Sequence, residues 1–520
     1  MSDEIAPEFM EDESESDTYS GEEMNEDEQF FLEQEEMEVA GRGDHTSDDT
    51  SDDTSDEDTS DDTSDDTSDD EEFRGERNGE THEQEVSVDR ISRLPDALLA
   101  SILSNLDTKE SMVTSVLSKR WRYVWMLVTK LKFREKSLEI EKIRKFAAGI
   151  NRILVVFNAQ YVVNFEVELT YYENFAADLF VWVVYALKSD VFEFSLLLNP
   201  SPSKDLYKLP NLIFDYPHLK DLWLRRCILA PLTVVDWPSL GRLYLEDIEL
   251  PQDVLDKIIA GCPLLYNCLL RSCWGFSRFE ANIQKFTLLG IGDSEDGNKD
   301  PLLEISAPLA QTLLLTPYLQ GRKWRVTNIS SAVKATIDLV GSDWDPSCSE
   351  ILSNTKDFLD NLQHVNKLNL GRDIMQVISM IALNSLELSH STRRCLEANV
   401  SCNDLDIDGI ICLLESSPNL ETLVIDGYKP KKNSPCFDPE CVTYDLRCEL
   451  LNLKTIEITI WPDPNFQGKP MMTLAQLLLK GCTVLEKMVV NVVGTDDFVS
   501  VIQNLLAYPR SSPNAVIYVP

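Results

Sequence analysis

The sequence has few of the residues from which metal sites are built. Its 520 residues include only five His, and none of them lies near Cys436 and Cys441, two cysteines that are close together in the chain. No CxxC pair occurs. Because structural zinc sites need closely spaced Cys and His ligands, we expect neither a metal nor any other cofactor.

Signals for export or membrane insertion are also missing. The opening stretch MSDEIAPEFMEDESES has neither the basic nor the apolar segment of a signal peptide. No run approaches the ~20 apolar residues that span a bilayer, and the best candidate, FVWVVYAL at 180–187, is typical of a buried element. We therefore expect no membrane contact, a location in the nucleus and/or the cytoplasm, and reduced cysteines.

Motifs for catalysis are absent as well. The chain contains no GxGxxG, GxxxxGKS/T, HExxH or GxSxG. A cysteine nucleophile would need an activating His, and the sequence pairs none of its cysteines with one. We expect a protein that is not an enzyme.

Basic residues are almost missing from the first 88 residues, which hold 37 Asp or Glu against 3 Arg, a net charge of −34. The whole chain carries −42, so the remaining 432 residues carry −8 and have no broad basic face for nucleic acid. Residues 46–70 repeat TSDD six times, once as TSDED. Such a tail cannot bury enough apolar surface to fold, so we expect residues 1–88 to be disordered. Each Thr has an acid three residues on, the spacing favoured by acid-directed kinases, although a merely solvating tail is the simpler interpretation.

Large apolar residues are concentrated in residues 90–125. Pro95 suits a helix start, and Leu98, Leu99, Ile102, Leu103 and Leu106 follow at helical spacing. Two further short helices are predicted, one with Met112, Val113, Val116 and Leu117, and one capped by Ser118 that carries Trp121, Val124, Trp125 and Val128. Three short helices cannot cover this much apolar surface, so we expect some of it to face a partner.

This segment resembles an F-box of the plant type. The resemblance rests on Asp89-Arg90-Ile91, Leu94-Pro95-Asp96, Leu98-Leu99, Ile102-Leu103-Ser104, Thr108-Lys109 and Thr114 through Trp121. It implies docking on a Skp-type adaptor, and through it on a cullin, by Leu94, Pro95, Leu98, Ile102, Leu106, Val116 and Leu117. The chain departs from the family at Asp107, where Pro is usual, and Asp suits the same turn. We call residues 89–135 the F-box segment.

Beyond residue 135 a strand pattern repeats. Its clearest copies are Leu219, Leu222, Leu224, Cys227; Leu240, Leu243, Leu245, Ile248; and Leu265, Cys268, Leu270, Cys273. Weaker copies lie around Val162, Val191, Ile283, Val365, Leu383, Leu420, Leu453 and Leu485. The connecting segments PQDVLDKIIAGCPLL, DIDGIICLLESSPNL and MMTLAQLLLKGCTVL each predict a helix. This pattern is the signature of leucine-rich repeats stacked in a solenoid.

The residues between the apolar ones should point away from the core, because side chains alternate across a strand. The candidate substrate-binding residues are therefore Trp223, Arg225, Tyr244, Glu246, Leu269 and Arg271. Trp223, Tyr244 and Leu269 should form an exposed apolar ladder flanked by charge, as in protein-binding hot spots. The alternative is that a loop or irregular packing covers these aromatic residues.

The last residues resemble the FBD module that closes many plant F-box proteins. The landmarks are Leu453-Lys454-Thr455, Leu485-Glu486-Lys487-Met488 and Pro509 through Pro513, with a divergent opening around 436–448. The predicted organisation is an α/β chain with a disordered acidic tail (1–88), a small three-helix F-box (89–135), an irregular leucine-rich-repeat solenoid (136–435) and an FBD-like module that continues it (436–520).

Taken as a whole, the sequence favours the substrate-recognition subunit of a Skp-cullin-F-box ubiquitin ligase, with a protein substrate bound by the repeats. Two alternatives stay open. One is a leucine-rich-repeat scaffold whose F-box serves a contact independent of any ligase. The other is a histone- or cation-binding protein that acts through its acidic tail.

Overall fold

The computed structural model describes residues 90–91, 93–157, 162–293, 301–318, 320–341, 348–400, 404–427, 450–460, 469–493, 503 and 505–518. All of them belong to one compact unit, Ser87–Pro520. The predicted disorder of residues 1–88 falls outside the described residues. Within those residues, no helix combines the length and the hydrophobicity needed to cross a bilayer.

Short helices open the described chain, as predicted. They are α2 (Asp96–Leu103), α3 (Thr108–Val113) with a 3-10 helix at Thr114–Val116, and α4 (Trp121–Val124) with a 3-10 helix at Trp125–Leu127. Pro95 is the residue that precedes α2. The hydroxyl of Ser118 accepts the Trp121 N–H at 3.4 Å, which places it at the start of α4.

The repeats form one parallel sheet of fifteen strands. In spatial order these are β1 (Lys130–Glu135), β2 (Asn164–Thr170), β3 (Glu193–Asn199), β5 (Asp221–Arg225), β7 (Arg242–Glu246), β8 (Asn267–Arg271), β10 (Leu288–Gly292), β12 (Thr312–Thr316), β14 (Lys334–Ile337), β15 (Lys367–Leu370), β16 (Cys395–Val400), β17 (Thr422–Gly427), β18 (Thr455–Ile460), β19 (Lys487–Val492) and β20 (Val516–Tyr518). Spatial order follows chain order throughout, which is the topology of a solenoid and confirms the predicted fold class.

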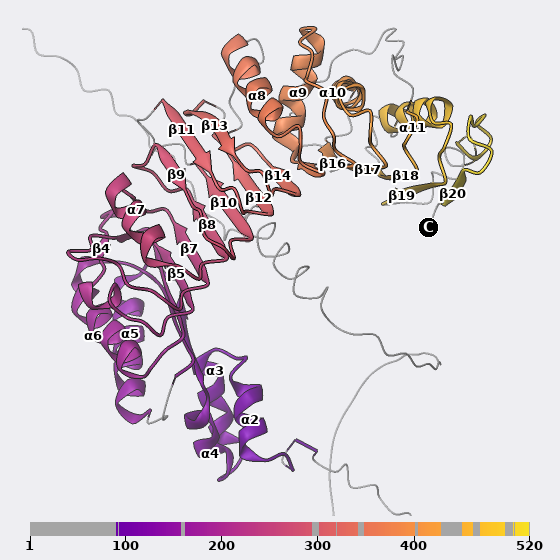
Figure 1. Cartoon of the computed structure of the whole chain (residues 1–520). Helices are drawn as coiled ribbons and strands as arrows, with labels where there is room; N and C mark the ends of the chain where they lie inside the picture. Colours follow the sequence, from indigo (N-terminus) through magenta and orange to yellow (C-terminus); the bar gives the residue numbers. More distant parts are fainter. Residues whose placement is uncertain are drawn as a thin grey trace, which may run out of the picture. The chain divides into compact units, whose positions relative to one another are not determined.

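A second layer packs along one face of this sheet (Figure 1). It contains α5 (Ile140–Val156), α6 (Ala176–Lys188), α7 (Gln252–Gly261), α8 (Ser349–Asn361), α9 (Arg372–Leu383), α10 (Asp404–Glu415) and α11 (Lys469–Gly481). In the middle repeats a three-stranded sheet of β9 (Arg278–Glu280), β11 (Leu302–Ser306) and β13 (Lys323–Asn328) contacts α7 at one end and α8 at the other. The pair β4 (Tyr207–Lys208) and β6 (Cys227–Ile228) completes the described strands.

Three successive repeats turn away from the sheet by the same local backbone conformation. After β5, β7 and β8 a residue takes a left-handed backbone conformation: Arg226 (φ 55°), Asp247 (φ 51°) and Ser272 (φ 49°). Such a single residue reverses the chain direction. The next residue in each case, Cys227, Ile248 or Cys273, is buried. The fourth position of the repeat pattern is therefore a core position, as predicted.

A row of buried apolar residues lies two positions before the strands. Its members are Val128, Val162, Val191, Leu219, Leu240, Leu265, Phe286, Ala310, Ala332, Val365, Leu420, Leu453 and Leu485. Before β16 the same position holds Arg393, which is 4% exposed. Its Nε and Nη1 atoms have no hydrogen-bond partner among the residues that the structure describes.

Two sequence expectations about the repeats were wrong. No strand begins near Leu383, because this residue ends the amphipathic helix α9. Strands β12, β14 and β16 were not predicted. The expected helices at α7, α10 and α11 are confirmed.

The short helices of the F-box segment are joined directly to the edge strand β1, with which the segment ends. The Lys132 backbone N–H donates to Thr108 Oγ1 at 2.8 Å, and the Thr129 N–H donates to Ser104 Oγ at 3.3 Å. The buried residues of the F-box segment and of the repeats form one continuous hydrophobic cluster. Side chains of the F-box segment thus take the place of a neighbouring strand at this edge.

Candidate functional site

The first candidate surface is the apolar face of the F-box segment. Helix α2 buries Leu99 and Leu103, whereas Leu98 and Ile102, four residues apart, are 53% and 49% exposed. Val116 is 81% exposed. Exposed apolar side chains at this density are unusual on a surface that has no partner.

The structure leaves most of the predicted adaptor-binding residues accessible. Pro95, Leu98, Ile102, Leu106, Val116 and Leu117 are exposed, and Leu94 is half-buried against the core. The sequence interpretation did not include four further exposed apolar residues of this segment: Ile91, Val113, Tyr123 and Leu127. Helical spacing could have identified Tyr123, which lies on α4 off the stripe that carries Trp121 and Val124.

The second candidate surface lies on the sheet face opposite the second layer, at β5, β7 and β8. Strand register places Trp223 beside Tyr244, and Tyr244 beside Leu269. The Trp223 and Tyr244 rings stack with centroids 3.8 Å apart and planes 18° from parallel. Both side chains are half-buried, so the stack presents part of its surface to solvent.

The predicted apolar ladder ends at this stack, because Leu269 is only 9% exposed and was wrongly expected to be open. The neighbouring strand carries Gly290 at the matching position. A Cβ on Gly290 would lie 2.1 Å from a methyl carbon of Leu269. Leu269 therefore fills the space that a side chain on β10 would otherwise occupy.

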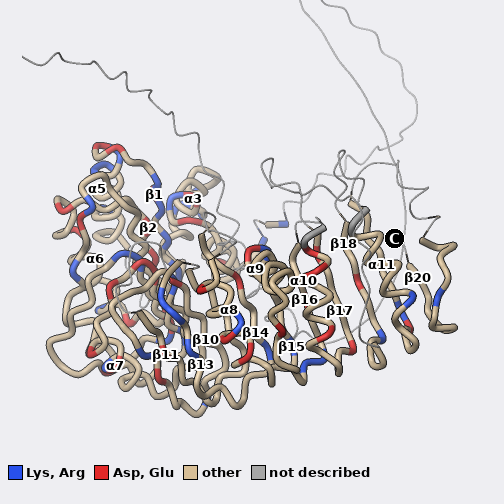
Figure 2. Tube along the Cα trace, turned by 90° about the horizontal axis from the view of Figure 1, so that it is seen from above, with Lys and Arg blue, Asp and Glu red and all other residues tan. Residues whose placement is uncertain are grey.

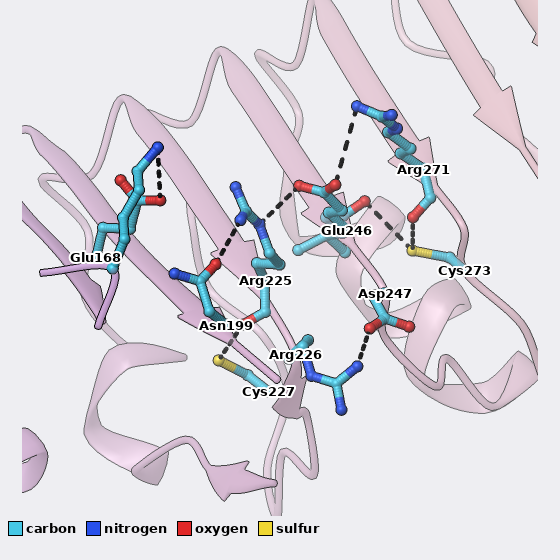
Figure 3. Close-up of polar contacts among 11 residues, drawn as sticks. Glu168, Asn199, Arg225, Arg226, Cys227, Glu246, Asp247, Arg271 and Cys273 are labelled. Atoms are coloured by element: carbon cyan, nitrogen blue, oxygen red, sulfur yellow. Dashed lines mark hydrogen bonds and ion pairs between the residues drawn. The ribbon is translucent and has the colours of Figure 1, made fainter. Parts of the chain in front are cut away.

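A row of polar contacts joins side chains of three neighbouring strands to Asn199 (Figure 3). The Arg225 guanidinium donates to Asn199 Oδ1 at 2.9 Å and to Glu246 Oε2 at 3.0 Å. The other oxygen of Glu246 lies 3.9 Å from Arg271 Nη1. All three predicted charged residues are thus brought together, with one carboxylate between two guanidiniums.

A second ion pair borders the rings on the other side. Arg242 donates to both oxygens of Asp221, at 2.8 Å and 2.6 Å. This bidentate contact explains why Asp221 is buried on a face where the alternation predicts an outward side chain. Figure 2 shows Lys and Arg interspersed with Asp and Glu along the strands.

Trp223 differs in its hydrogen bonding from three of the core tryptophans. The indole N–H of Trp182 donates to Asn151, that of Trp237 to a backbone oxygen and that of Trp324 to Asp293. Within the described part of the chain, the Trp223 N–H has no hydrogen-bond partner. It is therefore a donor that remains available to a bound molecule.

Buried thiols occur near this surface but do not favour covalent chemistry. Burial raises the pKa of the Cys227 and Cys273 thiols well above the ordinary range, so the reactive thiolate is not formed near neutral pH. Both sulfurs instead contact backbone oxygens. Among the described residues no group of three or more His, Cys, Asp or Glu is arranged to hold a metal. The geometry therefore suits noncovalent binding.

Comparisons with known proteins agree with this architecture. The F-box domain model matches residues 91–133, and the model described as "FBD-associated F-box protein At5g56370, LRR repeats" matches residues 181–338. The chain therefore carries an F-box followed by leucine-rich repeats, and it is similar to the F-box/leucine-rich-repeat proteins of plants.

Three relatives from Arabidopsis thaliana show the extent of the similarity. The putative F-box/LRR-repeat protein At5g02930 is 26% identical over 78% of this chain and 87% of its own length. F-box/LRR-repeat protein At3g03360 is 27% identical over 82% of this chain and 90% of its own length. FBD-associated F-box protein At5g22730 is 25% identical over 86% of this chain and 97% of its own length.

Two features of this F-box/leucine-rich-repeat protein bear on the family pattern. Asp107, which stands where Pro is usual, forms a capping box with Glu110 at the start of α3 and lies 3.4 Å from Arg134 of β1. Asp thus starts the helix and also contacts the sheet. The divergent opening of the predicted FBD-like module, around 436–448, lies outside the described residues.

Proposed function

We propose that this chain is the substrate-recognition subunit of a Skp-cullin-F-box ubiquitin ligase and is not itself the enzyme. The F-box segment would dock on the Skp-type adaptor, which links it to a cullin, and the repeats would bind a protein substrate. The observation that carries the proposal is the exposed apolar face of the F-box segment, in particular Leu98, Ile102 and Val116. Apolar anchors of this kind dominate protein-protein binding when a partner covers them.

The double substitution Leu98→Ala with Ile102→Ala tests this docking. Both side chains are exposed, so their truncation should leave the fold intact. Loss of two interface anchors, each contributing ~2 kcal/mol or more, should weaken adaptor binding at least a hundredfold. The measurement is co-purification with a recombinant Skp-type adaptor and cullin, with circular dichroism as the folding control.

A matched control is Val155→Ala on α5, where the side chain is 86% exposed but belongs to the repeats. It should bind the adaptor normally. Unchanged adaptor binding by the double variant would rule out this face. Adaptor binding without a cullin would favour the scaffold alternative, and histone binding lost on removal of residues 1–85 would favour the acidic-tail alternative. A fluorescent fusion would test the expected nuclear or cytoplasmic location.

A further inference from the structure

The stacked rings of Trp223 and Tyr244 form a small apolar platform on the open face of the sheet. A partner chain that crosses β5, β7 and β8 would travel ~10 Å, because adjacent strands are ~4.8 Å apart, which is about three residues of extended peptide. Trp223 on β5 and Tyr244 on β7 form the platform, and Leu269 occupies the matching position on β8. A flat or branched apolar side chain of the partner could cover the exposed part of the rings.

Charges around the platform favour a partner of negative charge. The outward positions of β5, β7 and β8 carry three arginines, Arg225, Arg242 and Arg271, against two carboxylates, Asp221 and Glu246, a local charge of +1. The Asp221 side chain is 10% exposed, whereas that of its partner Arg242 is 34% exposed. Glu246, at 30%, is about as exposed as its partners Arg225 and Arg271, at 20% and 28%. The accessible excess of positive charge therefore comes from Arg242, on a body whose overall charge is negative.

Hydrogen bonding points in the same direction. The Trp223 indole N–H has no partner among the described residues. On β5, Trp223 lies between Asp221 and Arg225, which each form an ion pair. A carboxylate or a backbone carbonyl of a peptide would satisfy it. Apolar contact, a free donor and a local positive charge therefore coincide within one small surface.

We infer that this surface binds an extended acidic peptide segment of a partner protein. An apolar side chain of the segment rests on Trp223 and Tyr244, an oxygen accepts the Trp223 N–H, and a neighbouring acidic side chain lies toward Arg271. The inference rests on the proposed function in that it gives the chemical class of the substrate segment bound by the repeats.

The test uses the full chain in complex with its Skp-type adaptor and a displayed library of random twelve-residue peptides. Enriched peptides should contain an aromatic or aliphatic residue next to Asp or Glu. Their synthetic copies should bind less tightly as NaCl is raised, because salt screens the charge contribution. Affinity is measured by fluorescence polarisation.

Single substitutions then separate the contributions. Trp223→Phe keeps a ring but removes the donor and should weaken binding roughly threefold to tenfold. Arg271→Gln should weaken binding about threefold, and Glu246→Gln, which raises the local charge from +1 to +2, should strengthen it by a similar factor. The matched control is Phe180→Ser, an aromatic residue 48% exposed on α6, which should have no effect.

Four outcomes would overturn the inference: no enrichment of peptides, enrichment of basic or purely apolar peptides, equal affinity of Trp223→Phe and the original chain, or tighter binding by Arg271→Gln together with weaker binding by Glu246→Gln. Adaptor capture is measured in the same samples. Peptide binding without adaptor capture would count against the proposed function alone, whereas adaptor capture without acidic-peptide binding would count against this surface alone.

Discussion

Replacing Arg393 by Met should stabilise the repeats. Burial lowers the pKa of the Arg393 guanidinium to about 10, and the Asp360 carboxylate opposes this lowering only in part. At 1.36 kcal/mol for each pKa unit, the charged group costs roughly 3 kcal/mol in the folded state. Met has a similar length and is apolar, so it restores the row that Val365 and Leu420 form on the neighbouring strands. We expect the free energy of unfolding to rise by about 2 kcal/mol.

The sign of the pH dependence follows from the same pKa. Because the folded pKa of Arg393 lies below its ordinary value of 12.5, the destabilisation is fully present below pH 10 and is relieved as the pH rises from about 10 toward 12.5. The stability difference between Arg393→Met and the original chain should therefore be constant from pH 6 to pH 9. Urea unfolding followed by circular dichroism measures it.

Local measurements and a control complete this test. Since stability in a solenoid is a sum of neighbouring contributions, hydrogen exchange should slow chiefly in β16 and α10. Leu420→Met, in the same row one repeat later, should change stability by less than ~1.5 kcal/mol. If Arg393→Met lowers the stability or leaves it unchanged, the guanidinium makes compensating contacts and the reasoning fails.

Two further predictions concern glycine packing and the F-box joint. Gly149→Ala in α5 should raise the thermal midpoint and the free energy of unfolding, the latter by ~0.5–1 kcal/mol, because the added Cβ would have no described neighbour within 4 Å beyond its own turn of helix. Gly261→Ala should lower it by ~1–3 kcal/mol, because the added Cβ would lie 2.3 Å from the Val235 backbone oxygen; equal midpoints for the two variants would contradict this. Thr108→Val removes the acceptor of the Lys132 N–H and should cost ~1–3 kcal/mol in urea unfolding, whereas an unaltered unfolding curve would show that water replaces the hydroxyl.

The repeats were predictable where their core positions are large and apolar. Strands β5, β7 and β8 carry Leu or Cys at nearly every inward position, so the spacing alone identifies them. Strand β16 was missed because Arg393 takes the position that is apolar in the neighbouring repeats. The false strand near Leu383 came from a short alternating pattern, LNSLELS, that continues from the end of helix α9.

The second candidate surface was predictable only in part. Alternation along a strand is a local property, and it correctly brought Trp223 next to Tyr244. The burial of Leu269 depends on Gly290, which lies on a strand of the next repeat. Nor could the pairing of Glu246 with two arginines be read from single strands, since it depends on the register across three of them.

The contact between the F-box helices and β1 also affects the tendency of the chain to aggregate. A sheet edge with unpaired N–H groups is a template for pairing with other chains, and solenoids need a cap at each end. Thr108 and Ser104 cover this edge, so a chain cut at the F-box would present β1 to other molecules. Removal of the residues before Lys130 would therefore promote aggregation as well as remove the proposed docking surface. Point changes on the outer face of α2 separate the loss of the proposed docking from the loss of a protective end.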